Sequence, residues 1–183
     1  MELVKNLQNQ NILKNLVIVI LGSLILTLSA KIKIPFYPVP MTMQTFVVLL
    51  LGITLGPKIA TSTVCLYLVE GILGLPVFSN SPERGVGLIY FTGPTMGYLI
   101  GFIFASFLSG YFHYNQNYFL NFVKLFLSVS MIYVFGVLWL GTLIGWDKPL
   151  FELGVKPFLI AEIFKLLILT IITNKIFYMR KFI

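Results

Sequence analysis

Residues 158–170 read Phe-Leu-Ile-Ala-Glu-Ile-Phe-Lys-Leu-Leu-Ile-Leu-Thr, an apolar run that contains one acid and one base, Glu162 and Lys165. The run is apolar enough to lie in hydrocarbon, where an ionised side chain costs about 2.5 to 3.5 kcal/mol even on the lenient insertion scale. The two residues stand three apart, so a helix places them on one face. Charges in such a place need a partner or a functional role, so this pair is the first candidate for a ligand-binding site.

Two interpretations of this pair stay open at the level of the residues. The pair can be a structural ion pair that fixes helix packing, or both groups can face a polar cavity and bind a small molecule. A carboxylate accepts hydrogen bonds from N–H groups, and an ammonium donates to a carbonyl or a carboxylate. The second interpretation therefore predicts a ligand with a urea-like or amide-like group.

The composition outside this run predicts an all-α integral membrane protein. The chain has 183 residues, is 58% hydrophobic and 10% charged, and has a mean hydropathy of +0.95. At about 20 residues per span, this length allows about six helices in one membrane domain over residues 1–183. The net charge of +7 comes from scattered lysines and arginines without a basic stripe, which favours loop charges facing a membrane over nucleic-acid binding.

Apolar segments that predict membrane helices follow one another along the whole chain. They cover residues 16–30, 42–55, 59–69, 94–112, 122–144 and 157–176. We expect the first to be retained as a span and not removed as a signal, because five more follow. Gly56-Pro57 predicts a tight turn that joins the second and third segments as a hairpin of two short helices.

Two of the connections are long. Residues 31–44 hold three prolines within six residues, each of which fixes φ and removes a backbone donor, so this stretch predicts a semi-rigid extended flap between the first two helices. Residues 71–92 form a longer connection, and loops of this length in a compact bundle are usually functional or disordered. Its apolar residues predict that it packs against the bundle.

The distribution of basic residues predicts the orientation in the membrane. With six spans, both termini and the second and fourth connections lie on one side, together with Lys5, Lys14, Lys58, Lys124, Lys175, Arg180 and Lys181. The other side holds Lys31, Lys33, Arg84, Lys148 and Lys156. The positive-inside rule places the more basic side, and so both termini, in the cytoplasm. Both long connections then face outward, where a ligand arrives.

Residues near the long connections are further candidates for ligand binding. Gly93-Pro94-Thr95 begins the fourth helix, where free amides and the Thr95 hydroxyl can receive an anion or a carbonyl, although an ordinary helix start has the same pattern. Arg84 carries forked donors suited to a carboxylate, or it pairs with Glu83 on the surface. Aromatic walls for a cavity are available from Phe36, Tyr37, Phe78, Tyr90 and Tyr98.

Small residues repeat every four positions in the fourth segment, at Gly93, Gly97, Gly101, Ala105 and Ser109. Such a face lets another membrane helix approach closely, so it predicts helix packing, with a partner-protein surface as the alternative. Ser23 and Thr27 repeat this spacing more weakly in the first helix.

Several catalytic and metal-binding patterns are missing from the sequence. It contains no Gly-x-x-x-x-Gly-Lys-Ser/Thr motif for ATP phosphates. One cysteine, Cys65, and one histidine, His113, allow neither a disulfide nor a clustered His/Cys metal site. We therefore expect no enzyme activity, no cofactor and no metal.

Four stretches carry a resemblance to a known family. They are Pro-Val-Pro-Met-Thr-Met-Gln at 38–44, Leu-Leu-Gly-Ile-Thr-Leu-Gly-Pro at 50–57, Gly-Ile-Leu-Gly-Leu-Pro-Val-Phe at 71–78 and Thr-Gly-Pro-Thr-Met-Gly-Tyr-Leu-Ile-Gly-Phe at 92–102. Together with Glu162-Ile-Phe-Lys165 they resemble the BioY family, the biotin-specific S components of energy-coupling factor (ECF) transporters. The resemblance implies a six-helix S-component bundle that binds biotin at its outward end, under the proline-rich loop between the first two helices.

The resemblance also implies partners and residue roles. The partners are a transmembrane coupling protein, called the T component, and two ATP-binding cassette ATPases in the cell membrane. Glu162 takes the place of the family's aspartate, and Lys165 that of its lysine. The implied substrate-binding residues are Glu162, Lys165, Arg84, Asn80, Gly93, Thr95, Tyr98, Thr42, Gln44, Phe78 and Tyr37. The implied contacts to the coupling protein are Ser23, Thr27 and Ala30.

Three rival hypotheses remain beside a biotin uptake subunit. The same architecture can serve another small vitamin. A small membrane enzyme can use Glu162 as general acid or base with His113. A structural subunit would bind no ligand at all. The residues leave open which polar group meets the ureido end of biotin and which meets its carboxylate.

Overall fold

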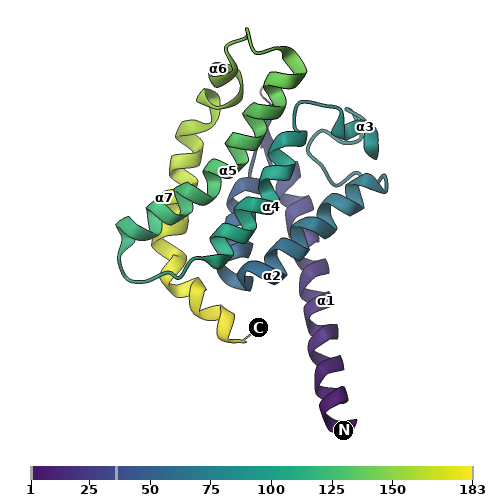
Figure 1. Cartoon of the computed structure of the whole chain (residues 1–183), viewed down its shortest axis with the longest axis vertical. Helices are drawn as coiled ribbons and strands as arrows, with labels where there is room; N and C mark the ends of the chain where they lie inside the picture. The colour runs from purple at the N-terminus through teal and green to yellow at the C-terminus, as the bar shows by residue number, and fades with distance from the viewer. Residues whose placement is uncertain (1, 36, 183) are drawn as a thin grey trace.

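The computed structural model describes the backbone of residues 2–35 and 37–182 and the side chains of residues 12–35 and 37–180. Five long helices form a bundle (Figure 1): α1 (Glu2–Lys31), α2 (Gln44–Ile72), α4 (Met96–Tyr111), α5 (Tyr118–Ile144) and α7 (Leu159–Ile176). The segment Ile12–Lys31 of α1 and the whole of α2 and α5 are long and apolar enough to cross a membrane, and α4 is a shorter apolar helix.

Helix α2 covers two of the predicted segments and is kinked between them. At Gly56 the backbone leaves the helical region, with φ 78° and ψ 174°, a conformation that is essentially restricted to glycine. Pro57 then supplies no N–H for the carbonyl of Ile53, so the helix cannot continue unbroken. The break lies at Gly56-Pro57, as the sequence predicted, and it divides α2 into two helical halves that run in different directions (Figure 1).

Helix α4 packs closely against α5 through its small residues, as their spacing predicted. A Cβ atom added to Gly97 would lie 2.3 Å from the Phe135 carbonyl oxygen, and one added to Gly101 would lie 2.5 Å from the Ile132 Cα. At the other end of α4, a Cβ on Gly110 would lie 2.6 Å from the Pro57 Cα, at the kink of α2. Close approach of this kind is how membrane helices associate without a hydrophobic drive between them.

Short elements fill the connections between the long helices. Between α1 and α2, strand β1 (Lys33–Ile34) pairs antiparallel with β2 (Met41–Thr42). Helix α3 (Leu88–Phe91) lies between α2 and α4, α6 (Leu150–Gly154) and the 3-10 helix η1 (Lys156–Phe158) precede α7, and η2 (Phe177–Phe182) follows it. In the connection between α2 and α4, residues such as Val77, Phe78 and Tyr90 are buried.

The two long connections, residues 32–43 and residues 73–95, are bound to each other and to the end of α1. The Lys31 ammonium donates to the carbonyls of Pro76, Phe78 and Ser81 at 2.8 to 3.0 Å. The Lys33 ammonium donates to Asn80 Oδ1 at 2.5 Å. These contacts place both connections over one end of the bundle, and the functional site lies beneath them.

Candidate functional site

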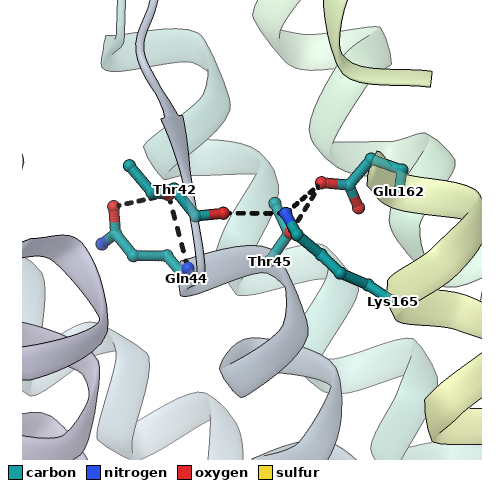
Figure 2. A network of polar contacts seen from close by, with 5 residues as sticks. All are labelled: Thr42, Gln44, Thr45, Glu162 and Lys165. Atoms are coloured by element: carbon teal, nitrogen blue, oxygen red, sulfur yellow. Dashed lines mark hydrogen bonds and ion pairs between the residues drawn. The ribbon is translucent and has the colours of Figure 1, made fainter. Parts of the chain in front are cut away.

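The two charges of α7 form a buried polar network with the start of α2 (Figure 2). Lys165 Nζ lies 2.7 Å from Glu162 Oε1, and the Thr45 hydroxyl donates to that oxygen at 2.8 Å. Lys165 also donates to Thr45 Oγ1 at 2.9 Å and to the Thr42 carbonyl at 2.7 Å. Glu162 is 5% exposed and Lys165 is 9% exposed. The ion pair of the first interpretation is therefore formed, and its remaining bonding capacity decides whether it also binds a ligand.

That remaining capacity belongs to Glu162. The three Lys165 contacts match the three N–H donors of an ammonium, so its donors are all used within the protein. A carboxylate has about four lone-pair sites, of which Glu162 uses two for Lys165 and Thr45 through Oε1 and one for the hydrogen bond with Tyr133. In Figure 2 the second carboxylate oxygen carries no contact to the residues drawn. Glu162 can thus accept a further hydrogen bond.

A cavity of about 520 Å³, including its open mouth, lies beside this network. Its walls come from β2, the start of α2, the connection between α2 and α4, and helices α4, α5, η1 and α7. Five of the predicted binding residues line it: Thr42, Gln44, Thr95, Tyr98 and Glu162. Hollows that combine apolar walls with a few convergent polar groups are typical small-molecule sites.

The other predicted binding residues lie behind the wall or outside it. Arg84 donates through Nη1 to the Pro38 carbonyl at 3.0 Å, and Asn80 accepts from Lys33. Trp139 donates to the Gly93 carbonyl at 2.9 Å. These contacts hold the two connections and the start of α4 in place.

The aromatic residues divide in the same way. Phe78 is 1% exposed and packs against Tyr67, Tyr90 and Phe91, away from the cavity. Tyr37 is 85% exposed, and Phe36 lies outside the described residues. Tyr90 and Tyr98 do line the cavity. Burial raises the pKa of the Tyr90 hydroxyl, against opposing effects of Thr95 and Arg84, so that it remains a hydrogen-bond donor.

Several wall residues were absent from the predicted set. They are Val39, Pro40, Met41, Thr45, Ser79, Leu99, Phe102, Ile132, Tyr133 and Phe158, together with Tyr90, which had been considered only as a possible aromatic wall. Thr45 and Ser79 each adjoin a predicted residue in the sequence, so extending each motif by one position would have found them. Ile132 and Tyr133 carry no such signal, because the helix that holds them looks like any apolar helix.

A second, apolar hollow of about 1100 Å³ lies on the other side of the Glu162 backbone, between α5 and α7. Tyr133 and Glu162 line both hollows. Its remaining walls are apolar side chains and Ser130, and many of them, such as Leu138 and Ile163, are exposed on the surface that faces lipid. The polar network therefore opens onto the first cavity, and only two side chains separate it from the second.

The three residues predicted to contact a coupling protein belong largely to the interior. Ser23 and Ala30 are 0% exposed, and the Ser23 hydroxyl donates to Glu70 of α2 at 2.9 Å. Thr27 donates to the Ser23 carbonyl. The exposed face of α1 carries other side chains, among them Leu21, Leu24, Ile25 and Leu28. A partner helix that contacts α1 would therefore meet leucine and isoleucine side chains there and not the small residues.

The hypothesis of an enzyme that joins Glu162 to His113 fails on geometry. Glu162 shares the cavity with Tyr98 at the start of α4, whereas His113 follows the end of that helix and packs against Phe177. The 16 residues of α4 separate the two ends by roughly 20 Å. Among the described residues, moreover, no three His, Cys, Asp or Glu side chains are grouped to hold a metal ion.

Fold and site together define a class: a helical membrane protein that encloses a small-molecule cavity beneath two joined loops, with a buried charge pair on its wall. The model of the BioY family matches residues 4–181. The chain therefore belongs to the BioY family, and the members of that family are transport proteins and not enzymes.

Individual relatives agree with this assignment. The chain is 34% identical over 150 residues to a protein of Pyrococcus horikoshii named probable biotin transporter BioY, covering 82% of this chain and 88% of that protein. It is 32% identical over 153 residues to the biotin transporter BioY of Thermotoga maritima, covering 83% and 89%. The crystal structure of the S-component for biotin from an ECF-type ABC transporter matches with a TM-score of 0.76 and 26% identity, covering 91% of this chain and 92% of that one.

Proposed function

We propose that this chain is the biotin-binding membrane subunit of an ECF transporter, which captures biotin at the end covered by the two connections. Its relatives are named biotin transporters, and the solved structure it matches is an S-component for biotin. In this role the chain selects and holds the vitamin. ATP hydrolysis occurs in two partner ATPases, which act through a transmembrane coupling protein.

The observation that carries the proposal is the cavity wall formed by Glu162 within its network. The ureido group of biotin offers N–H donors, and Glu162 retains capacity to accept one on the cavity side. Lys165 and Thr45 hold the carboxylate in place by hydrogen bonds, and it is 5% exposed. The apolar part of the wall, which includes Leu99, Phe102 and Ile132, suits the thioether ring.

A calorimetric titration of biotin into the detergent-solubilised full chain tests the proposal. We expect saturable binding by the wild-type chain and its loss in Glu162→Gln, which keeps the size of the side chain but removes the charge that pairs with Lys165. Glu152→Gln is the matched control, because Glu152 forms an exposed pair with Lys156 and neither residue lines the cavity. If the wild-type chain binds thiamine or riboflavin but not biotin, the substrate is that vitamin and not biotin.

The orientation is part of the proposal. We infer that both termini lie in the cytoplasm of a cell whose plasma membrane holds the protein, since Arg180 and the neighbouring basic residues lie at the end opposite the two connections. Biotin then enters from outside. A reporter enzyme that functions only in the cytoplasm should be active when fused to the C-terminus, and activity of an exclusively extracytoplasmic reporter at that position would reverse the orientation.

A further inference from the structure

Ser79 lines the cavity and has a buried hydroxyl without a partner among the described residues. Ser79 is 4% exposed and lines the cavity, and its Oγ atom is one of two buried side-chain polar atoms without a hydrogen bond among the described residues. The other, Thr61 Oγ1, does not line it. Buried hydroxyls normally find a partner, because losing water without replacement is unfavourable. A ligand in the cavity can supply such a partner.

The backbone around Ser79 is held by several hydrogen bonds, which fix the position of the residue on the cavity wall. The Tyr90 hydroxyl donates to the Ser79 carbonyl. The Lys31 ammonium binds the carbonyls of Phe78 and Ser81, on either side of it, and the Phe78 ring packs against Tyr67 and Tyr90. None of these contacts uses Ser79 Oγ.

Several other hydrogen-bond donors on the wall are engaged with the protein. Tyr98 donates to the Gly154 carbonyl, Thr45 to Glu162, and one N–H of the Gln44 amide to Tyr67. No bond within the described part of the protein uses the Ser79 hydroxyl, so it is available to a ligand group that only accepts hydrogen bonds, such as a carboxylate.

Electrostatics assign the two ends of a ligand to different parts of the cavity. Glu162 carries the negative charge that lines the wall, although Lys165 balances it. Around Ser79, three cations serve neutral carbonyl or amide oxygens: Lys31 at the end of α1, Lys33 on the facing connection, and Arg84 on the same connection as Ser79. Among the described residues, Glu83 is the one acid that acts on Lys31. A ligand carboxylate is attracted to the Ser79 side and repelled by Glu162, which accepts N–H groups instead.

We propose that Ser79 is a specificity-determining residue that donates a hydrogen bond to the carboxylate of the bound ligand, opposite a ureido group held by Glu162. This inference rests on the proposed function, since it takes biotin as the ligand. Ser79 then distinguishes the free acid from derivatives in which the carboxylate is missing.

The test compares Ser79→Ala with wild type in the full detergent-solubilised chain, using calorimetry with biotin and with biotinol, in which an alcohol replaces the carboxylate. Because a hydrogen bond to a charged group is the stronger kind, the substitution should weaken biotin binding by about tenfold or more and biotinol binding by less than about threefold. Ser79→Cys keeps a weak donor, so its affinity for biotin should lie between those of the wild type and Ser79→Ala. Thermal unfolding without ligand should stay near wild type, since no bond within the protein is lost.

Thr61→Val is the matched control, because it removes the other unpartnered buried hydroxyl at a position away from the cavity. It should leave both affinities unchanged. Wild-type affinity for biotin in Ser79→Ala, or an equal loss for biotin and biotinol, would overturn the role of Ser79 while leaving the proposed function intact. Wild-type chain that binds neither compound would overturn the proposed function and this assignment with it.

Discussion

The first half of α2 is held at each end by a cation from the C-terminal part of the chain, and the two cations do different work. At the start of α2, Lys165 of α7 binds the Thr42 carbonyl and the Thr45 hydroxyl. At the kink, Arg180 of η2 donates to the carbonyls of Ile53 and Gly52 at 2.6 and 2.8 Å. Arg180 satisfies carbonyls at the break of the helix, where Pro57 supplies no N–H, whereas Lys165 binds a carbonyl of β2 just before the helix and a side chain in its first turn.

The difference lies in what else each cation touches. Lys165 also pairs with a carboxylate on the cavity wall, so its charge is part of the site. Arg180 packs over the Phe177 ring, and among the described residues it forms no ion pair with a carboxylate. Burial lowers the pKa of Arg180, although an arginine remains charged at any ordinary pH. We therefore expect Lys165, which positions a group on the cavity wall, to affect ligand binding, and Arg180 to affect only stability.

Lys165→Met gives the most severe test of this comparison. Methionine keeps much of the stem but leaves Glu162 buried without its cation, which typically costs about 3 to 5 kcal/mol. We expect a large fall in the unfolding temperature and the loss of biotin binding, measured by thermal unfolding and calorimetry. Combining it with Glu162→Gln should recover part of the stability but not the binding. If Lys165→Met alone binds biotin normally, the ion pair has no role in ligand binding.

Thr45→Val removes the hydroxyl that bridges the pair while keeping the shape of the side chain. The lost hydrogen bonds involve charged groups, so about 1.5 to 3 kcal/mol of interaction is at stake. We expect weaker biotin binding together with a moderate drop in unfolding temperature. Thr54→Val serves as the control, because that hydroxyl bonds only to carbonyls of its own helix. If both variants bind biotin equally well, Thr45 does not position Glu162.

Arg180→Gln probes the cation at the kink. It leaves the Ile53 carbonyl without the donor that replaces the missing N–H of Pro57, at a cost of roughly 1 to 3 kcal/mol for an unsatisfied buried acceptor. The unfolding temperature should fall, whereas the affinity of the folded protein for biotin should stay within about twofold of wild type. A loss of affinity for biotin without a loss of stability would contradict the assignment of Arg180 to stability alone.

Lys33→Gln extends the comparison to an exposed cation and should have the smallest effect. Its contact with Asn80 lies on the surface, where substitutions usually change stability by less than about 0.5 kcal/mol. We expect an unchanged unfolding temperature and a slight change in the rate of biotin association, measured by stopped-flow fluorescence. A shift in unfolding temperature as large as that of Arg180→Gln would show that burial is not what sets the size of these effects.

The sequence predicted some parts of the cavity wall well. Glu162 was recognisable because a charge within an apolar run is unusual in a membrane protein. Tyr98 was predicted as a possible aromatic wall and through the family motif at residues 92–102. Thr42 and Gln44 came from the family motif around the prolines. Arg84 and Asn80 have side chains suited to a ligand, but in the structure Arg84 donates to the Pro38 carbonyl and Asn80 accepts from Lys33.

Other parts needed the folded chain. Tyr133 reaches the cavity from the middle of a uniformly apolar helix, and nothing in its own neighbourhood distinguishes it from residues that face lipid. Ser23 and Ala30 have the small size of a partner-contact face, but α2 covers them first. The kink of α2 was visible in Gly56-Pro57, whereas the direct continuation into the second half depends on α4 packing against it at Gly110.

What the sequence alone determined is the membrane class, the order of the helices, the break at Gly56-Pro57 and the family, because hydropathy, glycine and proline act locally along the chain. What only the tertiary structure decided is which polar groups share a cavity. Glu162, Ser79 and Thr45 lie far apart in the sequence and meet on one wall. Their meeting depends on close helix packing and on bonds between connections, and these are properties of the whole bundle that no short segment encodes.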